Sequence, residues 1–393
     1  MSAPAALIIP DDPAFVRADI CGTSLLLRSL CVFARCGARP YVLRTAVCTE
    51  ASVPDLARAL ARREGIAAPV WVDDVAAVPT DAGLFVLRAP AVIDVRLCAA
   101  LQRAAEGNGH LVRCGPAADV DAPIWYADGS RGRDLLAAMT TGAEPARRAL
   151  ASQAVAIDAG DALCAPISDA DSVRRAEERL LARTSKPSDT FLARNFDRHI
   201  SHWLTRRLMH RNVTPNQVTL VSTGVGLLGV VLLLLGTYGP QLIGSGLVLL
   251  ATIIDGVDGE LARLKFLESE LGRKLDFWLD NVVNASALFA AGAGYGLTTG
   301  SAVYLWASAF NLVAAATTAV PIYFLFFRPG ATASSSRLEG ILKLFAGRDY
   351  AYLVFALAVV GRVHWFTWIC LAGLTVFLVA ALALVAHRLR PRI

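Results

Sequence analysis

Residues 255–280 read DGVDGELARLKFLESELGRKLDFWLD, and four aspartates in this stretch decide how the chain is organised. Asp255 and Asp258 lie three residues apart, and Asp276 and Asp280 lie four apart. On helices, either spacing places both carboxylates of a pair on one face. Each pair borders an apolar run of membrane-spanning length, where carboxylates are costly and mark candidate functional sites. Because four converging carboxylates repel one another, we expect a multivalent cation to hold them together.

Glycine, alanine and arginine recur at fixed intervals between these aspartates. The complete pattern comprises Asp255, Asp258, Gly259, Ala262, Arg263, Gly272, Asp276 and Asp280. It resembles the signature of the CDP-alcohol phosphotransferases, membrane enzymes that make phospholipids and related phosphodiesters. Upstream, residues 214–219 (TPNQVT) are similar to the start of that family's first transmembrane helix. The resemblance covers roughly the second half of the chain.

The resemblance implies a reaction in which an acceptor hydroxyl attacks the phosphorus next to the alcohol of a CDP-alcohol and CMP leaves. Two divalent cations suit this chemistry, because they clamp both the attacked phosphoryl group and the leaving oxygen. Carboxylate ligands favour hard cations, Mg²⁺ or Mn²⁺. The expected metal ligands are Asp255, Asp258, Asp276 and Asp280. Asp280 is also the expected catalytic base, which must reach the acceptor hydroxyl within hydrogen-bond distance.

Further residues are expected to bind the two substrates. The nucleotide-binding set is Thr219, Gly259, Ala262, Arg263 and Gly272. A side chain at either glycine would block the approach of a nucleotide to the backbone, and Arg263 is expected to pair with the diphosphate. The candidate acceptor-phosphate set is Arg328, Lys343 and Arg348. The alternative is that these three basic residues only mark the cytosolic side of the membrane.

The second half of the chain consists mostly of long apolar runs, and six membrane spans can be drawn in it. They are residues 217–236, 240–258, 277–297, 302–327, 349–363 and 365–386. Basic residues concentrate in alternate connections and in the tail, so both termini, the aspartates and the N-terminal half are expected on the cytosolic side of a cell inner membrane. Residues 186–212 combine apolar and basic positions at helical spacing and predict an amphipathic helix on the membrane surface.

Composition limits the class of protein. The 393 residues are 55% hydrophobic and 18% charged. The net charge of +5 is mild and the arginines cluster near membrane boundaries, so neither feature indicates nucleic-acid binding. Seven of eight cysteines precede residue 165 without metal-ligand spacing, which favours reduced thiols in a cytosolic domain. The first residues, MSAPAALIIPDDP, lack the features of a signal peptide.

Residues 1–168 alternate short apolar runs with helical stretches and predict a Rossmann-like α/β domain with a largely parallel sheet. Strands are expected at ALIIP, PYVLRTAV, APVWV and LFVLRAP, and helices near 24–36, 54–64 and 94–107. Residues 22–44 resemble nucleotidyltransferase domains. The loop after the first strand, residues 10–15, has no glycine to wrap a triphosphate, and LFVLRAP runs to Arg88 rather than to a metal-binding acid. We therefore expect a domain without nucleotidyltransferase activity.

The predicted organisation is a soluble domain (1–168), a connector with the amphipathic helix (169–214), and a six-helix membrane domain (215–393). The donor is expected to be CDP-diacylglycerol or a CDP-polyol. Relatives that fuse a nucleotidyltransferase to this membrane domain make di-myo-inositol phosphate phosphate, so CDP-inositol with inositol phosphate is the alternative substrate pair. The resemblance also implies a homodimer. A prenyltransferase would lack the intervening glycines and Ala-Arg pair, and an inactive scaffold would tolerate loss of an aspartate.

Overall fold

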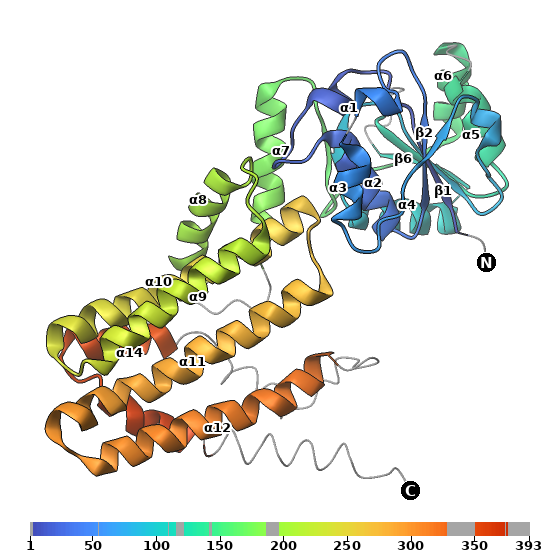
Figure 1. The fold of residues 1–393 in the computed structure, drawn as a ribbon. Coiled ribbons are helices and arrows are strands. Elements are labelled where there is room, and N and C mark those ends of the chain that lie inside the picture. Colours follow the sequence, from blue (N-terminus) through green and yellow to red (C-terminus); the bar gives the residue numbers. More distant parts are fainter. Residues whose placement is uncertain are drawn as a thin grey trace, which may run out of the picture. The chain divides into compact units, whose positions relative to one another are not determined.

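The computed structural model describes residues 3–53, 55–108, 110–114, 122–140, 144–185, 196–327, 350–373 and 375. The chain forms two compact units. The first comprises Met1–Thr184, Met209–Asn212 and Arg263–Ser269, and the second comprises Ser185–Leu208, Val213–Ala262 and Glu270–Ile393. Figure 1 shows strands and short helices in the first unit and long helices in the second.

The first unit is built on a seven-stranded mixed sheet with the order β3-β2-β1-β4-β7-β6-β8. Its strands are β1 (Ala5–Ile8), β2 (Arg39–Leu43), β3 (Val70–Val72), β4 (Leu84–Leu87), β6 (Leu111–Cys114), β7 (Ile124–Ala127) and β8 (Val155–Ile157). The four predicted strands, β1 to β4, pair in parallel as expected. β7 runs antiparallel to both β4 and β6. β6 and β7 are consecutive, and a connection too short for a crossover helix favours antiparallel pairing.

Helices cover both faces of this sheet. They are α1 (Ala14–Arg17), α2 (Leu25–Arg35), α3 (Leu56–Ala61), α4 (Val95–Asn108), α5 (Gly132–Thr140), α6 (Glu144–Gln153) and α7 (Ala170–Ala182), and β5 (Ala91–Ile93) pairs with β9 (Cys164–Pro166). Successive strand side chains point to opposite faces. Leu7 and Trp125 therefore join a core with Leu135 of α5 on one face. On the other face, the Phe85 ring lies 5.7 Å from that of Phe33 in α2.

Two segments that are distant in sequence complete the first unit. Gly22 has a φ of +74°, and a Cβ there would lie 2.1 Å from the carbonyl oxygen of Met209. Only glycine permits that conformation and that approach, so Gly22 fixes the path of Met209–Asn212. Arg63 donates from Nε to the carbonyl oxygen of Lys265 at 3.1 Å, which holds Arg263–Ser269 against the same unit.

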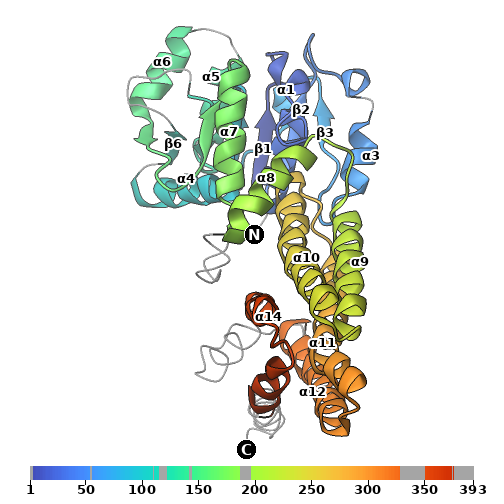
Figure 2. The same ribbon diagram turned by 90° about the vertical axis from the view of Figure 1, so that its left-hand side faces the viewer.

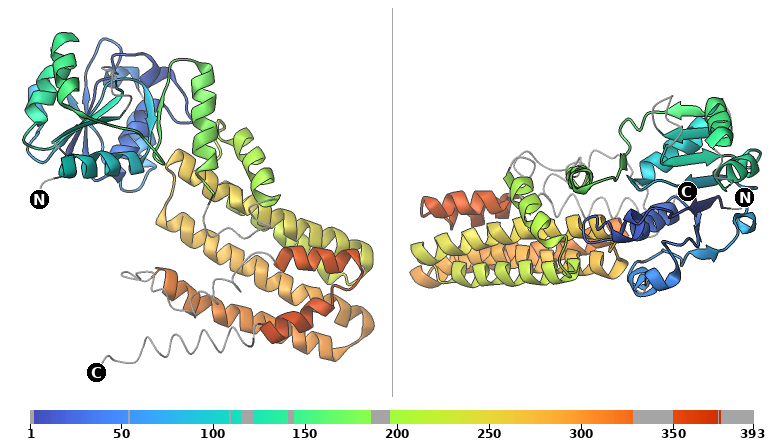
Figure 3. Two further views of the ribbon diagram at one scale, coloured as in Figure 1. Left: turned by 180° about the vertical axis from the view of Figure 1, so that it is seen from behind. Right: turned by 90° about the horizontal axis from the view of Figure 1, so that it is seen from above.

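The second unit is helical. Its elements are α8 (Arg198–Leu208), α9 (Pro215–Leu234), α10 (Tyr238–Lys265), α11 (Glu270–Thr299), α12 (Ala302–Phe327) and α14 (Tyr350–Val359), with the last turn of α10 belonging to the first unit. α9 and α10 run side by side in Figures 1 and 2, and α11 and α12 do so in Figure 3. Thr214 caps α9 with Gln217 in a capping box and Pro215 opens its first turn, so the predicted start of the first membrane helix is correct.

Within the described residues, three helices are long and apolar enough to cross a membrane, namely Pro215–Leu234, Tyr238–Lys265 and Ala302–Val320. They indicate an integral membrane protein and confirm the first, second and fourth predicted spans. The third predicted span lies in α11, whose charged first turns and many small residues make it less apolar. The fifth coincides with α14, which has only 10 residues. Most of the sixth, 365–386, lies outside the described residues.

Glycines let the helices of the second unit approach one another closely. A Cβ at Gly229 would lie 2.7 Å from the carbonyl oxygen of Gly244, and a Cβ at Gly244 would lie 2.6 Å from that of Gly229. A Cβ at Gly294 of α11 would lie 2.4 Å from the carbonyl oxygen of Leu233. Small residues are the usual means of such packing in lipid. They bring α9 against both α10 and α11, the helices that carry the aspartates.

Candidate metal centre

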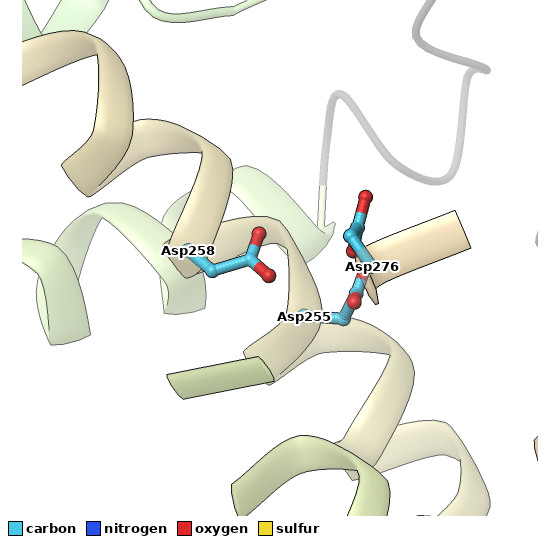
Figure 4. Close-up of side chains that lie close together, drawn as sticks. All are labelled: Asp255, Asp258 and Asp276. Carbon is cyan, nitrogen blue, oxygen red and sulfur yellow. The ribbon is translucent and has the colours of Figure 1, made fainter. Parts of the chain in front are cut away.

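Three of the four aspartates converge. Asp255 and Asp258 lie three residues apart on α10, and Asp276 lies in the second turn of α11. Each offers a carboxylate oxygen within 4.8 Å of the other two. Figure 4 shows the three side chains drawn together, with those of α10 facing that of α11. Asp255 and Asp258 are only 4% and 7% exposed.

This arrangement is electrostatically costly for the protein alone. Two unit charges 4.8 Å apart repel by about 3–4 kcal/mol at an effective dielectric constant of about 20, and the cluster contains three such pairs. Burial raises the cost further, because it removes water from the carboxylates. A divalent cation with a preference for hard oxygen ligands offsets both effects. Three converging carboxylates therefore fit Mg²⁺ or Mn²⁺.

Asp280 lies one helical turn beyond Asp276 and is not a member of the three-carboxylate cluster. It lines a small cavity of about 20 Å³ together with Asp255. The other polar residues of the cavity wall are Ser222 and Thr223 of α9, Thr252 of α10 and Asn284 of α11. A space of this size accommodates about one water-sized group. The structure thus places Asp280 beside the cluster, and its roles as base and fourth ligand remain predictions.

Thr219 of α9 contacts the cluster directly. Its Oγ1 donates a short hydrogen bond to Oδ2 of Asp258, and the Thr219 side chain is 3% exposed. Its Oγ1 also lies 3.2 Å from the carbonyl oxygen of Pro215. A hydrogen bond to a charged acceptor is stronger than one between neutral groups and restricts the acceptor's orientation. Thr219 therefore orients Asp258, and a contact between Thr219 and a nucleotide remains a prediction.

The other predicted nucleotide-binding residues flank the aspartates. Gly259 and Ala262 lie on α10, and Gly272 lies in the first turn of α11. Arg263 donates from Nη2 to the carbonyl oxygen of Thr184 at 3.0 Å, so this arginine has a protein partner in the first unit. Nucleotide binding by these four residues remains a prediction. Arg328, Lys343 and Arg348 lie outside the described residues.

Sequence reasoning missed one buried acid of the motif, Glu260. Its side chain is fully buried on α10, and Arg198 of α8 pairs with it at 2.6 Å. Ser201 and Thr205 donate hydroxyl hydrogen bonds to the same carboxylate at 2.8 and 2.6 Å. The signal was present in the sequence, because Arg198, Ser201 and Thr205 recur at helical spacing and form a polar stripe on α8.

The opposite face of α8 is apolar and exposed. Phe196, just before the helix, is 58% exposed, and Ile200 and Trp203 within it are 46% and 55% exposed. The guanidinium of Arg207 lies 4.6 Å from the Trp203 ring. Aromatic and basic side chains on one face are typical of a helix at a membrane surface. Glu260 thus fastens α8 to the helix that carries two of the aspartates, and the location of α8 at a membrane surface remains a prediction.

The sequence of residues 212–376 matches the family model of the CDP-alcohol phosphatidyltransferases. This segment is a CDP-alcohol phosphatidyltransferase domain. The match contains all four aspartates and Glu260, and it confirms the resemblance predicted from their spacing. The chain therefore carries a domain of this enzyme family over residues 212–376.

Similar curated proteins carry one description, "Bifunctional IPC transferase and DIPP synthase". The protein of this description from Thermococcus kodakarensis is 38% identical over 120 residues, which cover 30% of this chain and 26% of the relative. That from Rubrobacter xylanophilus is 34% identical over 168 residues, which cover 39% of this chain and 38% of the relative. The Aquifex aeolicus protein is 32% identical over 121 residues, 30% of this chain and 27% of the relative. The aligned segments thus span less than half the length of these relatives.

Proposed function

We propose that this protein transfers a substituted phosphate from a CDP-polyol to the hydroxyl of a polyol phosphate and releases CMP. The convergence of Asp255, Asp258 and Asp276 supports the phosphotransfer, because the cluster provides a cation site beside a polar cavity. The relatives described as DIPP synthases favour CDP-inositol and inositol phosphate over CDP-diacylglycerol as the substrates. We also propose that the protein is oriented in the membrane with the aspartates on the cytosolic side.

In this proposal Asp255, Asp258 and Asp276 hold the cations, with Asp280 as a further ligand or as the base. Bound divalent cations would supply charge neutralisation for the diphosphate and the departing CMP. Thr219 fixes the orientation of Asp258 through its hydroxyl hydrogen bond. The position of Asp280 beside Asp255 suits a base that removes the proton of the acceptor hydroxyl. The acceptor oxygen forms the new bond to phosphorus as the bond to CMP breaks.

The proposal for the first unit depends on the residues that follow its parallel strands β1 and β4. The carboxyl ends of parallel strands are where α/β sheets bind ligands. After β1, Asp12 accepts a hydrogen bond from the Ala14 amide at 2.7 Å and starts α1 without a glycine-rich loop. After β4 the chain reaches Arg88. We propose a nucleotidyltransferase-like domain that transfers no nucleotide.

The test is mass spectrometry of products formed by the purified full chain. It is offered CDP-inositol or CDP-diacylglycerol, each with inositol phosphate, glycerol phosphate or no acceptor. We expect a phosphodiester and CMP from CDP-inositol with inositol phosphate, and none after chelation of divalent cations. A product only from CDP-diacylglycerol would replace the proposed donor, and product formation in excess chelator would refute the cation site.

The first unit has a separate test in a background without phosphotransfer. The Asp255→Asn chain is incubated with CTP and inositol phosphate, and formation of CDP-inositol is measured. We expect none. Nucleotide transfer by this variant would show that the α/β domain is catalytic despite its loop.

A further inference from the structure

A second cavity lies wholly within the first unit, and none of the four aspartates lines it. It has a volume of about 230 Å³ and lies between α2, the start of α4, the end of α7 and the segment Arg263–Ser269. Its charged lining consists of Arg28, Arg96, Arg183, Arg263 and Asp94. Four guanidinium groups thus face one carboxylate around a cavity large enough for a small organic molecule.

The one carboxylate is already engaged. Arg183 forms a short ion pair with Asp94 and also donates to the carbonyl oxygen of Asp161 at 2.8 Å. Arg96 is exposed at the start of α4, where it adds a further positive charge to the rim. The lining therefore carries a net positive charge after its internal pair is formed.

One of these positive charges is buried, because the side chain of Arg28 is only 2% exposed. Its Nη2 donates to the carbonyl oxygens of Leu264 at 2.5 Å and Ile20 at 3.3 Å, both of which are neutral acceptors. Its Nε has no hydrogen-bond acceptor among the described residues. Burial lowers the pKa of Arg28 below its ordinary value, and the nearby Glu177 carboxylate opposes that shift only in part. A buried guanidinium held by carbonyl groups is costly unless an anion compensates it.

The apolar part of the cavity wall indicates which chemical group accompanies the anion in a ligand. Phe266 lines the cavity, and its ring lies 5.1 Å from the Arg28 guanidinium. Val32 and Leu180 add apolar surface beside it. Arginine recognises phosphate oxygens with paired N–H donors, and the apolar wall suits a carbon skeleton. Inorganic phosphate alone would leave that wall without a partner.

We propose that this cavity binds a small organic phosphomonoester, with its phosphate among the arginines and its organic group against Phe266. The proposed reaction involves two such phosphomonoesters, the polyol phosphate acceptor and the CMP product. Arg263 lies in the last turn of α10 and Phe266 follows it in the connector to α11, so the bound ligand would also restrain the connection between the two aspartate helices.

The test measures binding to the full chain by isothermal titration calorimetry with three probes, myo-inositol 1-phosphate, CMP and inorganic phosphate. It uses the Asp255→Asn variant in excess chelator, so that the candidate metal centre does not contribute. Failure of the proposed reaction therefore leaves this test unaffected. Arg96→Ala removes an exposed cavity arginine, and Arg103→Ala is its control, because Arg103 lies on the same helix and donates to the Ala99 carbonyl oxygen at 3.2 Å.

We expect at least one organic phosphomonoester to bind, with a Kd at least tenfold weaker in Arg96→Ala and unchanged in Arg103→Ala. The tighter of the two organic probes identifies the source of the ligand. Hydrogen exchange of residues 263–269 should slow when that probe is bound. Absence of binding up to millimolar concentration, equal loss in both variants, or equal affinity for inorganic phosphate would overturn the proposal.

Discussion

Helix α10 buries carboxylates on two of its sides and neutralises them in two ways. Glu260 is paired with Arg198 and accepts two hydroxyl hydrogen bonds from α8. Asp255 and Asp258 instead point to a third carboxylate, Asp276 of α11. A paired and hydrogen-bonded acid fastens two helices together, whereas converging acids attract a cation. The difference separates a structural carboxylate from the candidate metal ligands within six residues of the same helix.

The largest expected effect comes from breaking the converging cluster. Asp255→Asn removes one charge from the cation site while preserving the side-chain shape. We expect phosphotransfer to fall by roughly 10³-fold or more, since a bound cation contributes several kcal/mol to transition-state stabilisation. Release of labelled CMP measures the rate. Asp55→Asn, an exposed carboxylate beside Arg58, is the control. Near-normal activity in Asp255→Asn would contradict the metal-centre assignment.

Asp280→Asn asks whether the fourth aspartate acts differently from the three that converge. If Asp280 is the base, turnover should fall by about 10²- to 10³-fold, because a positioned general base contributes about that much. Binding of the CDP-alcohol should persist, as measured by titration calorimetry with divalent cations present. Full turnover would eliminate the base assignment. Loss of cation binding equal to that in Asp255→Asn would show that Asp280 is principally a ligand.

Glu260→Ala tests the structural carboxylate. It removes the fully buried carboxylate that pairs with Arg198 and accepts from Ser201 and Thr205, and removal of one member of a buried pair typically costs about 3–5 kcal/mol of stability. We expect a clear drop in melting temperature and, at temperatures where the chain remains folded, a loss of activity of about tenfold. Glu270→Gln is the control, because Glu270 is an exposed acid at the start of α11. A variant as stable as the control would show that α8 does not depend on Glu260.

Thr219→Val should have the smallest effect on activity. It tests whether a hydrogen bond that orients Asp258 matters to the converging aspartates as the hydrogen bonds of Glu260 matter to the structural carboxylate. It removes the hydrogen bond to Asp258 and keeps the shape of the side chain. We expect activity to fall by about three- to tenfold, or about 0.7–1.4 kcal/mol, which is within the range for an ordinary intramolecular hydrogen bond. The activity should recover partly at higher Mg²⁺ concentration, because the carboxylate remains but is less well oriented. Thr317→Val on α12 is the control, since its hydroxyl donates to the carbonyl oxygen of Val313 in its own helix.

Much of the molecule was predictable from local pattern. Apolar runs and turn residues located β1 to β4 and helices α2 to α4, because strand and helix periodicities are local properties. The spacing of the aspartates singled out Asp255, Asp258 and Asp276, the three carboxylates that converge in the candidate metal centre. The antiparallel strand β7 was not predicted, because its pairing depends on a connection whose course is not encoded by periodicity. Arg28 was not singled out either, since a single arginine in an apolar helix gives no sign of what it contacts 236 residues away.

The sequence alone determined the chemical identity of the site, because four carboxylates, two glycines and an Ala-Arg pair at fixed intervals specify which groups a helix presents on one face. Only the tertiary structure decided which acids meet. It brought Asp276 to Asp255 and Asp258 and gave Glu260 to Arg198. It also surrounded a cavity with arginines from four distant segments. Such encounters depend on how helices pack across the chain, and packing is a long-range property that residue spacing does not contain.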